Sequence, residues 1–200
     1  MSRVAGPLVF QQGIAALAFR VILGVWVAFE AIMAIRQRWL VGGRLPHDPS
    51  GYVLWLTLTG SVIAAMGLGR ADPLTWPGGR VWPVVAGLAL ICVGIALRGW
   101  SIATLGPFFQ YRIEVQRGHR VVSDGPYRYV RHPSYSGIVL VLIGIALATG
   151  DVLSVVVVAV LGSIGLTVRI RAEERQLTDA LGAQYECFAA KRKRLVPGVW

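Results

Sequence analysis

Charged residues are scarce in this sequence: they make up 15% of its 200 residues, whereas soluble domains average about 25%. Hydrophobic residues account for 55% of the chain, and they come in blocks rather than at amphipathic spacing. This composition excludes an ordinary soluble domain and predicts a polytopic membrane protein. We therefore expect an all-α integral membrane protein with a single membrane domain over residues 1–200.

Cysteine is also rare. Cys92 lies inside an apolar block and Cys187 lies near the C-terminus, so their spacing predicts neither a disulfide nor a zinc site, and we expect no metal. The apolar stretch at residues 7–10 is too short to be the core of a cleavable signal peptide. The pair Gly67-x-Gly69 lacks the strand–turn–helix context of a dinucleotide-binding loop.

Basic residues are the one abundant charge, giving a net charge of +10. Such a charge is compatible with nucleic-acid binding, but these residues lie between the apolar blocks and not along one soluble face. Positive-inside membrane topology with contacts to anionic lipid headgroups is the better interpretation, and we expect no nucleic-acid partner.

The apolar blocks predict about five transmembrane helices. Three N-terminal spans are expected within residues 1–97, at Ile14–Ile35, Tyr52–Leu68 and Val81–Leu97. Residues 98–200 then form a second half, with a polar connection, a helical hairpin over 133–168, and a C-terminal helix and basic tail. That helix is expected to leave the membrane and continue to Leu181, where Gly182 can cap it.

Topology follows from the distribution of basic side chains. With five spans, 16 of the 20 Lys and Arg residues lie on one side, in the loops after the first and third spans and in the tail. Only Arg3, Arg70 and Arg80 lie on the other side. The N-terminus is thus predicted outside, and the basic side is predicted to be cytoplasmic. Arginine outnumbers lysine by 18 to 2, which favours a bacterial source and hence the bacterial inner membrane.

Two charged residues interrupt the first span. Arg20 and Glu30 are about 15 Å apart along a helix, too far for a direct pair. We expect Arg20 near the outer interface and Glu30 turned into the bundle, with a substrate-facing Glu30 as the alternative.

The predicted hairpin brings two polar clusters together. With its turn near Gly150, an antiparallel pair sets residue i level with residue 301 − i, which places His132 opposite Arg169. Pro133 suits the first turn of a helix, whose free N–H groups and positive dipole end can receive a carboxylate. We take this junction as the candidate active site. Taken alone, the first cluster also fits a helix start with interfacial Arg and Tyr anchors, and the second also fits a solvated juxtamembrane helix with i,i+4 ion pairs.

The spacing of these residues resembles a known family. Gly-Pro-Tyr-Arg-x-x-Arg-His-Pro-x-Tyr at 125–135, followed by Glu-Glu-x-x-Leu-x-x-x-x-Gly-x-x-Tyr at 173–185, is similar to the isoprenylcysteine carboxyl methyltransferases. Phospholipid N-methyltransferases share part of this pattern. The resemblance covers about residues 116–194, and the first three spans match only in being apolar.

The resemblance implies a membrane methyltransferase that uses S-adenosyl-L-methionine, forms S-adenosyl-L-homocysteine and has no Rossmann domain. It assigns Arg169 to the substrate carboxylate, with Arg131 and Glu174 as further catalytic candidates. The implied cofactor contacts are Gln116, His119, Arg120, Val121, Val122, Tyr127, His132, Pro133, Ser134, Tyr135 and Glu173.

Four functions remain in competition at this point. The first is carboxyl O-methylation of a lipophilic, isoprenylcysteine-like small molecule or lipidated peptide that reaches the site from the bilayer. The second is N-methylation of an amine phospholipid such as phosphatidylethanolamine, which requires a base to remove a proton. A nicotinamide-dependent membrane reductase and a non-enzymatic scaffold complete the set. The sequence leaves the natural methyl acceptor and the oligomeric state open.

Overall fold

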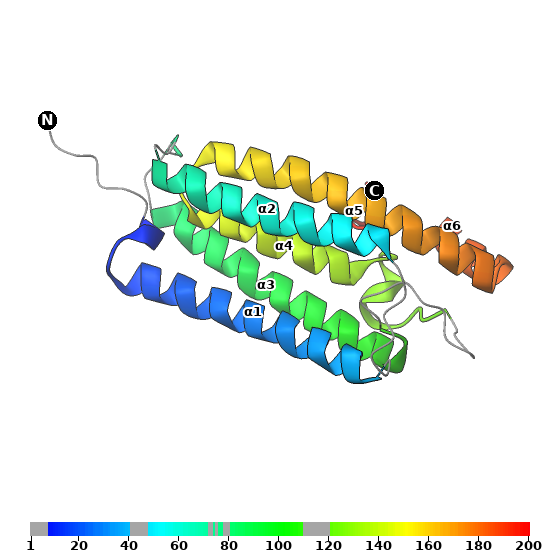
Figure 1. Cartoon of the computed structure of the whole chain (residues 1–200). Coiled ribbons are helices and arrows are strands. Elements are labelled where there is room, and N and C mark those ends of the chain that lie inside the picture. Colours follow the sequence, from blue (N-terminus) through cyan, green and yellow to red (C-terminus); the bar gives the residue numbers. More distant parts are fainter. Residues whose placement is uncertain (1–7, 41–47, 72–73, 75, 78–80, 110–120) are drawn as a thin grey trace, which may run out of the picture.

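The protein is described by a computed structural model that covers residues 8–40, 48–71, 74, 76–77, 81–109 and 121–200 (Figure 1). This part of the chain is helical, and its one extended pairing is an isolated bridge between Val130 and Lys193. The α-helices are α1 (Ile14–Leu40), α2 (Pro49–Ala71), α3 (Val81–Leu105), α4 (Pro133–Ala148), α5 (Val152–Leu181) and α6 (Ala183–Ala190). Short 3₁₀ helices lie at η1 (Leu8–Phe10), η2 (Gly106–Phe108) and η3 (Gly125–Arg128). The all-α prediction is confirmed.

Within the described residues, four helices are long and apolar enough to cross a membrane: α1, α2, α3 and α5. The remaining expected span, α4, is apolar but has only 16 residues, or about 24 Å of helix. It therefore lies at the lower limit for crossing the hydrocarbon core. The expected spans are all present as helices, and this one is shorter than a usual transmembrane helix.

The helices form one bundle, with α1 beside α3 and α4 between α3 and the α2–α5 pair (Figure 1). α4 packs mainly on α3, and α5 mainly on α2, so the contact between the two arms of the hairpin is the smaller one. The C-terminal ends of α1 and α3, the starts of α2 and α4, and the C-terminal half of α5 gather at one end of the bundle (Figure 1). We call this end the polar end, because the ion pairs described below lie there.

Two glycine pairs set the register between α3 and α4. A Cβ atom built on Gly94 would lie 2.6 Å from the carbonyl oxygen of Gly137, and one built on Gly87 would lie 2.5 Å from that of Gly144. No real side chain fits at such distances, so only glycine allows this approach of the two backbones. Ile91, between the two pairs in sequence, is fully buried. Small residues at a helix contact are typical of membrane packing, where lipid removes the hydrophobic driving force.

The hairpin turn and the end of α5 are defined by local chemistry. Gly150 has a φ of 75°, and the Asp151 carboxylate then caps α5 by accepting from the Ser154 backbone N–H at 2.6 Å. The same carboxylate accepts from the Leu74 N–H at 2.8 Å, which fastens the turn to the segment after α2. α5 ends at Leu181 and Gly182 follows with a φ of 53°, as predicted.

The third helix continues further than predicted. The sequence suggested that it ends near Leu97 and that Arg98 begins a polar connection, but α3 runs to Leu105. Arg98 therefore lies inside the helix, with a side chain that is 3% exposed. A charge is tolerated there because Glu30 of α1 neutralises it, and that long-range partner is invisible to a local reading of hydropathy.

Candidate active site at the polar end

The start of α4 forms a tight corner. Gly125 adopts a φ of 52° close against α3, and a Cβ atom there would lie 2.8 Å from the Thr104 hydroxyl. Tyr127 in η3 is buried, and burial together with the negative charge of Glu173 raises the pKa of its phenol. His132 then stands at the N-cap position and Pro133 opens the helix. The chain thus turns sharply and points the first turn of α4 toward α5.

The two predicted clusters meet at this corner. The Tyr135 hydroxyl donates to Glu173 Oε2 at 2.7 Å and accepts from Arg169 Nε at 3.1 Å. The His132 ring stacks on the Tyr135 ring, with 5.7 Å between their centres. The structure therefore places the residues of the Arg-His-Pro motif beside those of the twin-glutamate motif.

The register of this meeting differs from the sequence expectation. His132 was expected level with Arg169, but its ring contacts Glu174 at 3.3 Å, more than one turn further along α5. Arg169 instead contacts Tyr135, nearly one turn further into α4. Simple counting from the turn was wrong because α4 takes its position mainly from α3, through the glycine pairs, and not from α5.

Glu174 is the centre of a clamp. Its Oε1 atom contacts Arg131 Nη1 at 2.7 Å and His132 Nε2 at 3.3 Å, while Oε2 accepts from Arg194 Nη2 at 2.8 Å and Nε at 3.0 Å. A carboxylate has about four acceptor positions, and these four contacts use them. The geometry favours a role for Glu174 in holding the tail against the corner, with no position left for a ligand.

Backbone contacts strengthen the same clamp. The N–H groups of Arg131 and His132 donate to the carbonyls of Lys193 and Arg194 at 2.9 and 3.0 Å. The Ser136 hydroxyl donates to the Leu195 carbonyl at 2.6 Å. The basic tail, residues 191–195, therefore lies along the corner in register with it.

Arg169, the predicted substrate arginine, is almost completely buried and already has an acidic partner. Its Nη1 atom pairs with the Asp48 carboxylate and lies 3.1 Å from the Ser50 hydroxyl. Asp48 also accepts from the Ser50 hydroxyl at 2.6 Å and the Gly51 N–H at 3.1 Å at the start of α2. Burial acts to raise the Asp48 pKa, but these hydrogen bonds and the Arg169 charge together lower it. Sequence reasoning missed Asp48 and Ser50, although the Asp-Pro-Ser at a helix start was a visible capping signal.

A second buried ion pair joins α1 to α3. Arg98 Nε and Nη2 donate to the two oxygens of Glu30 at 2.5 and 2.8 Å, and Nη1 donates to the Ser134 hydroxyl at 2.7 Å. Glu30 is thus turned into the bundle, as expected. Ser134, an expected cofactor contact, is held from α3, which the sequence did not indicate.

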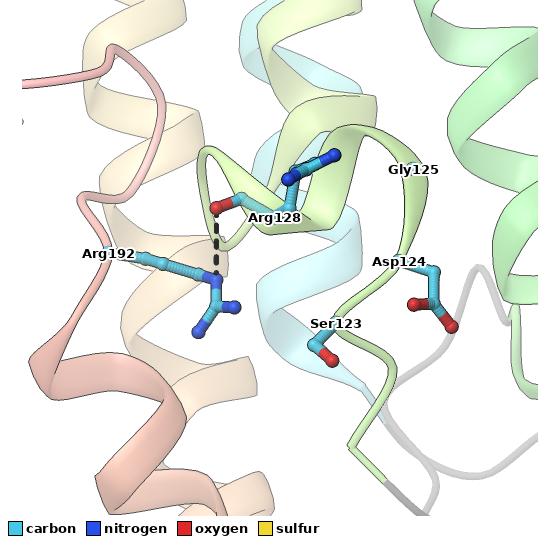
Figure 2. A pocket seen from close by; sticks show the side chains of 5 residues that line it. All are labelled: Ser123, Asp124, Gly125, Arg128 and Arg192. Carbon is cyan, nitrogen blue, oxygen red and sulfur yellow. Dashed lines mark hydrogen bonds between the residues drawn. The ribbon is translucent and has the colours of Figure 1, made fainter.

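The remaining predicted residues are divided between described and undescribed parts of the chain. Gln116, His119 and Arg120 lie outside the described residues. Val121 and Val122 are half-buried and lead into η3. A polar pocket of about 480 Å³ follows them, lined by Ser123, Asp124, Gly125, Arg128 and Arg192 (Figure 2). Arg192 of the tail donates to the Arg128 carbonyl at 3.3 Å across this pocket (Figure 2).

The fold and the site define the class of protein: an all-helical integral membrane protein with a network of buried ion pairs at one end of the bundle. Over residues 87–179 the chain matches the family model of the isoprenylcysteine carboxyl methyltransferase (ICMT) family. The match begins within α3, well before Gln116, so it includes Arg98 as well as the first motif at 125–135, and it ends within the second motif. The resemblance therefore extends into the third span, which had been expected to match the family only in being apolar.

Several relatives are similar to this chain. Protein-S-isoprenylcysteine O-methyltransferase B of Arabidopsis thaliana is 33% identical over 120 residues, which are 59% of this chain and 61% of that protein. The Schizosaccharomyces pombe protein-S-isoprenylcysteine O-methyltransferase is 31% identical over 114 residues, 56% of this chain and 47% of that protein. The uncharacterized protein YpbQ of Bacillus subtilis is 28% identical over 134 residues, 66% of this chain and 75% of that protein. The chain thus spans about half to three quarters of the length of these relatives.

The fold has a solved counterpart. The structure of the eukaryotic intramembrane Ras methyltransferase ICMT superposes with a TM-score of 0.64 at 20% sequence identity, covering 96% of this chain and 70% of that one. At this identity the likeness concerns the fold, and it includes the N-terminal helices. The fold match and the family match therefore point to the same family of membrane proteins.

Proposed function

We propose that this protein is an S-adenosyl-L-methionine-dependent methyltransferase that methylates the carboxylate of a lipophilic, isoprenylcysteine-like substrate at the membrane interface. The observation that carries the proposal is the chain of contacts from Glu173 through the Tyr135 hydroxyl to Arg169. It links the residues that the family resemblance assigns to the cofactor with the arginine that it assigns to the acid. The two reactants would then meet at the polar end.

The residues at the corner fit such a cofactor. Glu173 is 28% exposed; among the described residues it accepts one hydrogen bond, from Tyr135, and its Oε1 lies 3.8 Å from His132 Nδ1. It therefore keeps acceptor positions for the ammonium or hydroxyl groups of a ligand. Tyr127, His132, Pro133, Ser134 and Tyr135 would complete the cofactor site. When bound, the cofactor supplies an electrophilic methyl group on a sulfonium. The protein has to hold that group in line with the acceptor oxygen, about 3–3.5 Å from it.

A carboxylate acceptor suits this site. It is ionised at neutral pH, so transfer needs no general base. One carboxylate oxygen forms the new bond to the methyl carbon as the carbon–sulfur bond breaks, and no proton moves. Arg169 would orient the acid with two parallel hydrogen bonds, and the burial of this arginine would help to exclude water from the nucleophile.

The acid has to compete with an internal carboxylate, because Arg169 is paired with Asp48. We expect the substrate acid to exchange with Asp48 or to share the guanidinium with it. Arg131 and Glu174 would act less directly, by fixing the corner and the tail. The positive-inside bias would place this polar end on the cytoplasmic side, where the soluble cofactor arrives, while the lipid part of the substrate stays in the bilayer.

The test uses purified protein with radiolabelled S-adenosyl-L-methionine and an N-acetylated S-prenylcysteine. Transfer to the acid gives a methyl ester, from which alkali releases labelled methanol. The matching prenylcysteine amide, which has no carboxylate, should accept no label. Alkali-stable label in phosphatidylethanolamine would instead support N-methylation, and the absence of label in any lipophilic acceptor would reject the proposal.

A further inference from the structure

Arg98 is a charged side chain in an apolar membrane helix, and the motif of the family does not explain it. It is 3% exposed, and its guanidinium lies 5.8 Å from the centre of the Trp26 ring of α1. Burying a cation at this depth is costly unless it is paired, and Glu30 provides the pair. If the two charges had no other role, apolar residues in their place would cost the protein little stability.

The position of Arg98 follows from the packing of α3 on α4. The antiparallel register that pairs Gly94 with Gly137 also brings Arg98, one turn after Gly94, beside Ser134, one turn before Gly137. A Cβ atom on Gly137 would lie 3.0 Å from the Arg98 backbone and Cβ, so the two helices touch here. Arg98 is therefore fixed at the first turn of α4.

The hydrogen bond between Arg98 and Ser134 fixes the direction of the serine hydroxyl. A guanidinium only donates, so the Ser134 oxygen must accept from Arg98 Nη1 at 2.7 Å. The hydroxyl hydrogen then points elsewhere. Among the described residues, Ser134 donates no hydrogen bond from this hydroxyl, although its side chain is buried. A buried donor without a protein acceptor is costly and is available to a ligand.

We propose that Arg98, held by Glu30, is a positioning residue that turns the Ser134 hydroxyl into a hydrogen-bond donor for an oxygen of the bound cofactor. The inference rests on the proposed function, since it takes the cofactor site to include the first turn of α4. It adds a role for the Glu30–Arg98 pair, which lies outside the cofactor motif. Arg98 acts through Ser134 and does not itself touch the reacting atoms.

The test measures binding of S-adenosyl-L-homocysteine by calorimetry, so it needs no knowledge of the methyl acceptor. Ser134→Ala removes the donor and leaves the ion pair intact. Arg98→Gln offers an amide oxygen, to which the Ser134 hydroxyl can donate instead of to the ligand. Each variant should weaken binding roughly tenfold, the effect of losing one well-placed hydrogen bond. Arg98→Lys, which still only donates, should bind within about threefold of wild type.

The combination Arg98→Gln with Ser134→Ala should bind no more weakly than Ser134→Ala alone, because both changes remove the same contact. Additive losses, or binding by Ser134→Ala within twofold of wild type, would overturn the inference. Ser61→Ala, which removes a fully buried hydroxyl in the middle of α2, is the matched control and should leave binding unchanged. If Arg98→Gln does not fold, the double variant Glu30→Gln with Arg98→Gln, which removes both charges, is used in its place. A wild-type protein that binds no S-adenosyl-L-homocysteine would refute the proposed function itself, an outcome distinct from equal binding by all variants.

Discussion

Arg169 on α5 forms an ion pair with Asp48, which lies 121 residues earlier at the start of α2. The Arg169 side chain is 2% exposed and that of Asp48 is 10% exposed, and the same guanidinium contacts Tyr135 of α4. One arginine therefore joins three helices. In the ligand-free protein, Asp48 thus pairs with the arginine that we propose to bind the substrate acid.

Asp48→Asn should destabilise the ligand-free protein. Asparagine still caps α2, but it leaves Arg169 without its counter-charge, and breaking a buried pair in this way costs about 3–5 kcal/mol. An acid ligand should restore part of this loss, so a prenylcysteine acid should raise the unfolding temperature of the variant more than that of wild type. Asp124→Asn, at an exposed position, is the control. An equal ligand effect in both proteins would argue against exchange at Arg169.

The same pair predicts a pH dependence. The Asp48 pKa is lowered in the folded protein, so its contribution to stability is complete above the ordinary carboxyl pKa of about 3.9. The contribution is lost as the pH falls through the lowered pKa. The stability difference between wild type and Asp48→Asn should therefore be constant from about pH 7 to 5 and shrink under stronger acid. Unfolding followed at several pH values measures it, and a difference that grows on acidification would contradict the assignment.

Arg169→Ala should lower methyl transfer far more than it lowers cofactor binding. Loss of two charged hydrogen bonds to the acid predicts a fall in turnover of about a hundredfold or more. Binding of S-adenosyl-L-homocysteine should change far less, because Arg169 reaches the cofactor residues only through Tyr135. Arg175→Ala, an exposed arginine on the same helix, should retain activity. Full turnover by Arg169→Ala would reject the role of Arg169 in holding the acid.

Glu174→Gln should release the tail. The change removes the charge that holds Arg131 and Arg194, and two charged hydrogen bonds of this kind are worth about 1.5–3 kcal/mol each. Trypsin should then cleave after Arg192 and Arg194 at least tenfold faster, as followed by mass spectrometry. Glu186→Gln, an exposed glutamate of α6, should leave cleavage unchanged. Equal protection of the tail in both variants would show that Glu174 is not the clamp.

Gly94→Ala should disturb the bundle and the site together. The added methyl group would meet the Gly137 carbonyl at 2.6 Å, and overpacking of this kind costs about 1–3 kcal/mol. Gly99→Ala on the same helix is an informative control, because no atom lies within 4 Å of the added methyl group. It should be neutral or slightly stabilising, since alanine favours helix more than glycine does. Thermal unfolding in detergent compares the two variants, and equal stability would show that the α3–α4 contact can adjust.

Much of the fold could be predicted from local sequence. Long apolar blocks predicted each of the long helices, because a bilayer-spanning segment has to satisfy its own backbone hydrogen bonds. Breakers and caps predicted the turn at Gly150 and the end of α5 at Leu181. The helix that was placed least well is α3, whose end was assigned to Leu97 on the ground that Arg98 is charged. Charge alone does not end a helix when a partner lies on another helix.

The site was predicted in part. The convergence of the Arg-His-Pro corner with Glu173 and Arg169 followed from the hairpin, since both arms had equal length. The partners of those residues did not follow, because Asp48 and Arg98 lie outside the two motifs and are brought in by tertiary packing. Glu30 was expected to face the bundle, but nothing in its neighbourhood identified Arg98 as the residue that receives it.

The amino-acid sequence by itself determined that this chain is helical, that it belongs in a membrane, and that two polar motifs meet at the open end of a helical hairpin, away from its turn. Only the tertiary structure decided which atoms face each other there. The reason is physical: the glycine contacts between α3 and α4 fix the position of α4 along the axis of the bundle. This position brings His132 to Glu174, Tyr135 to Arg169 and Ser134 to Arg98.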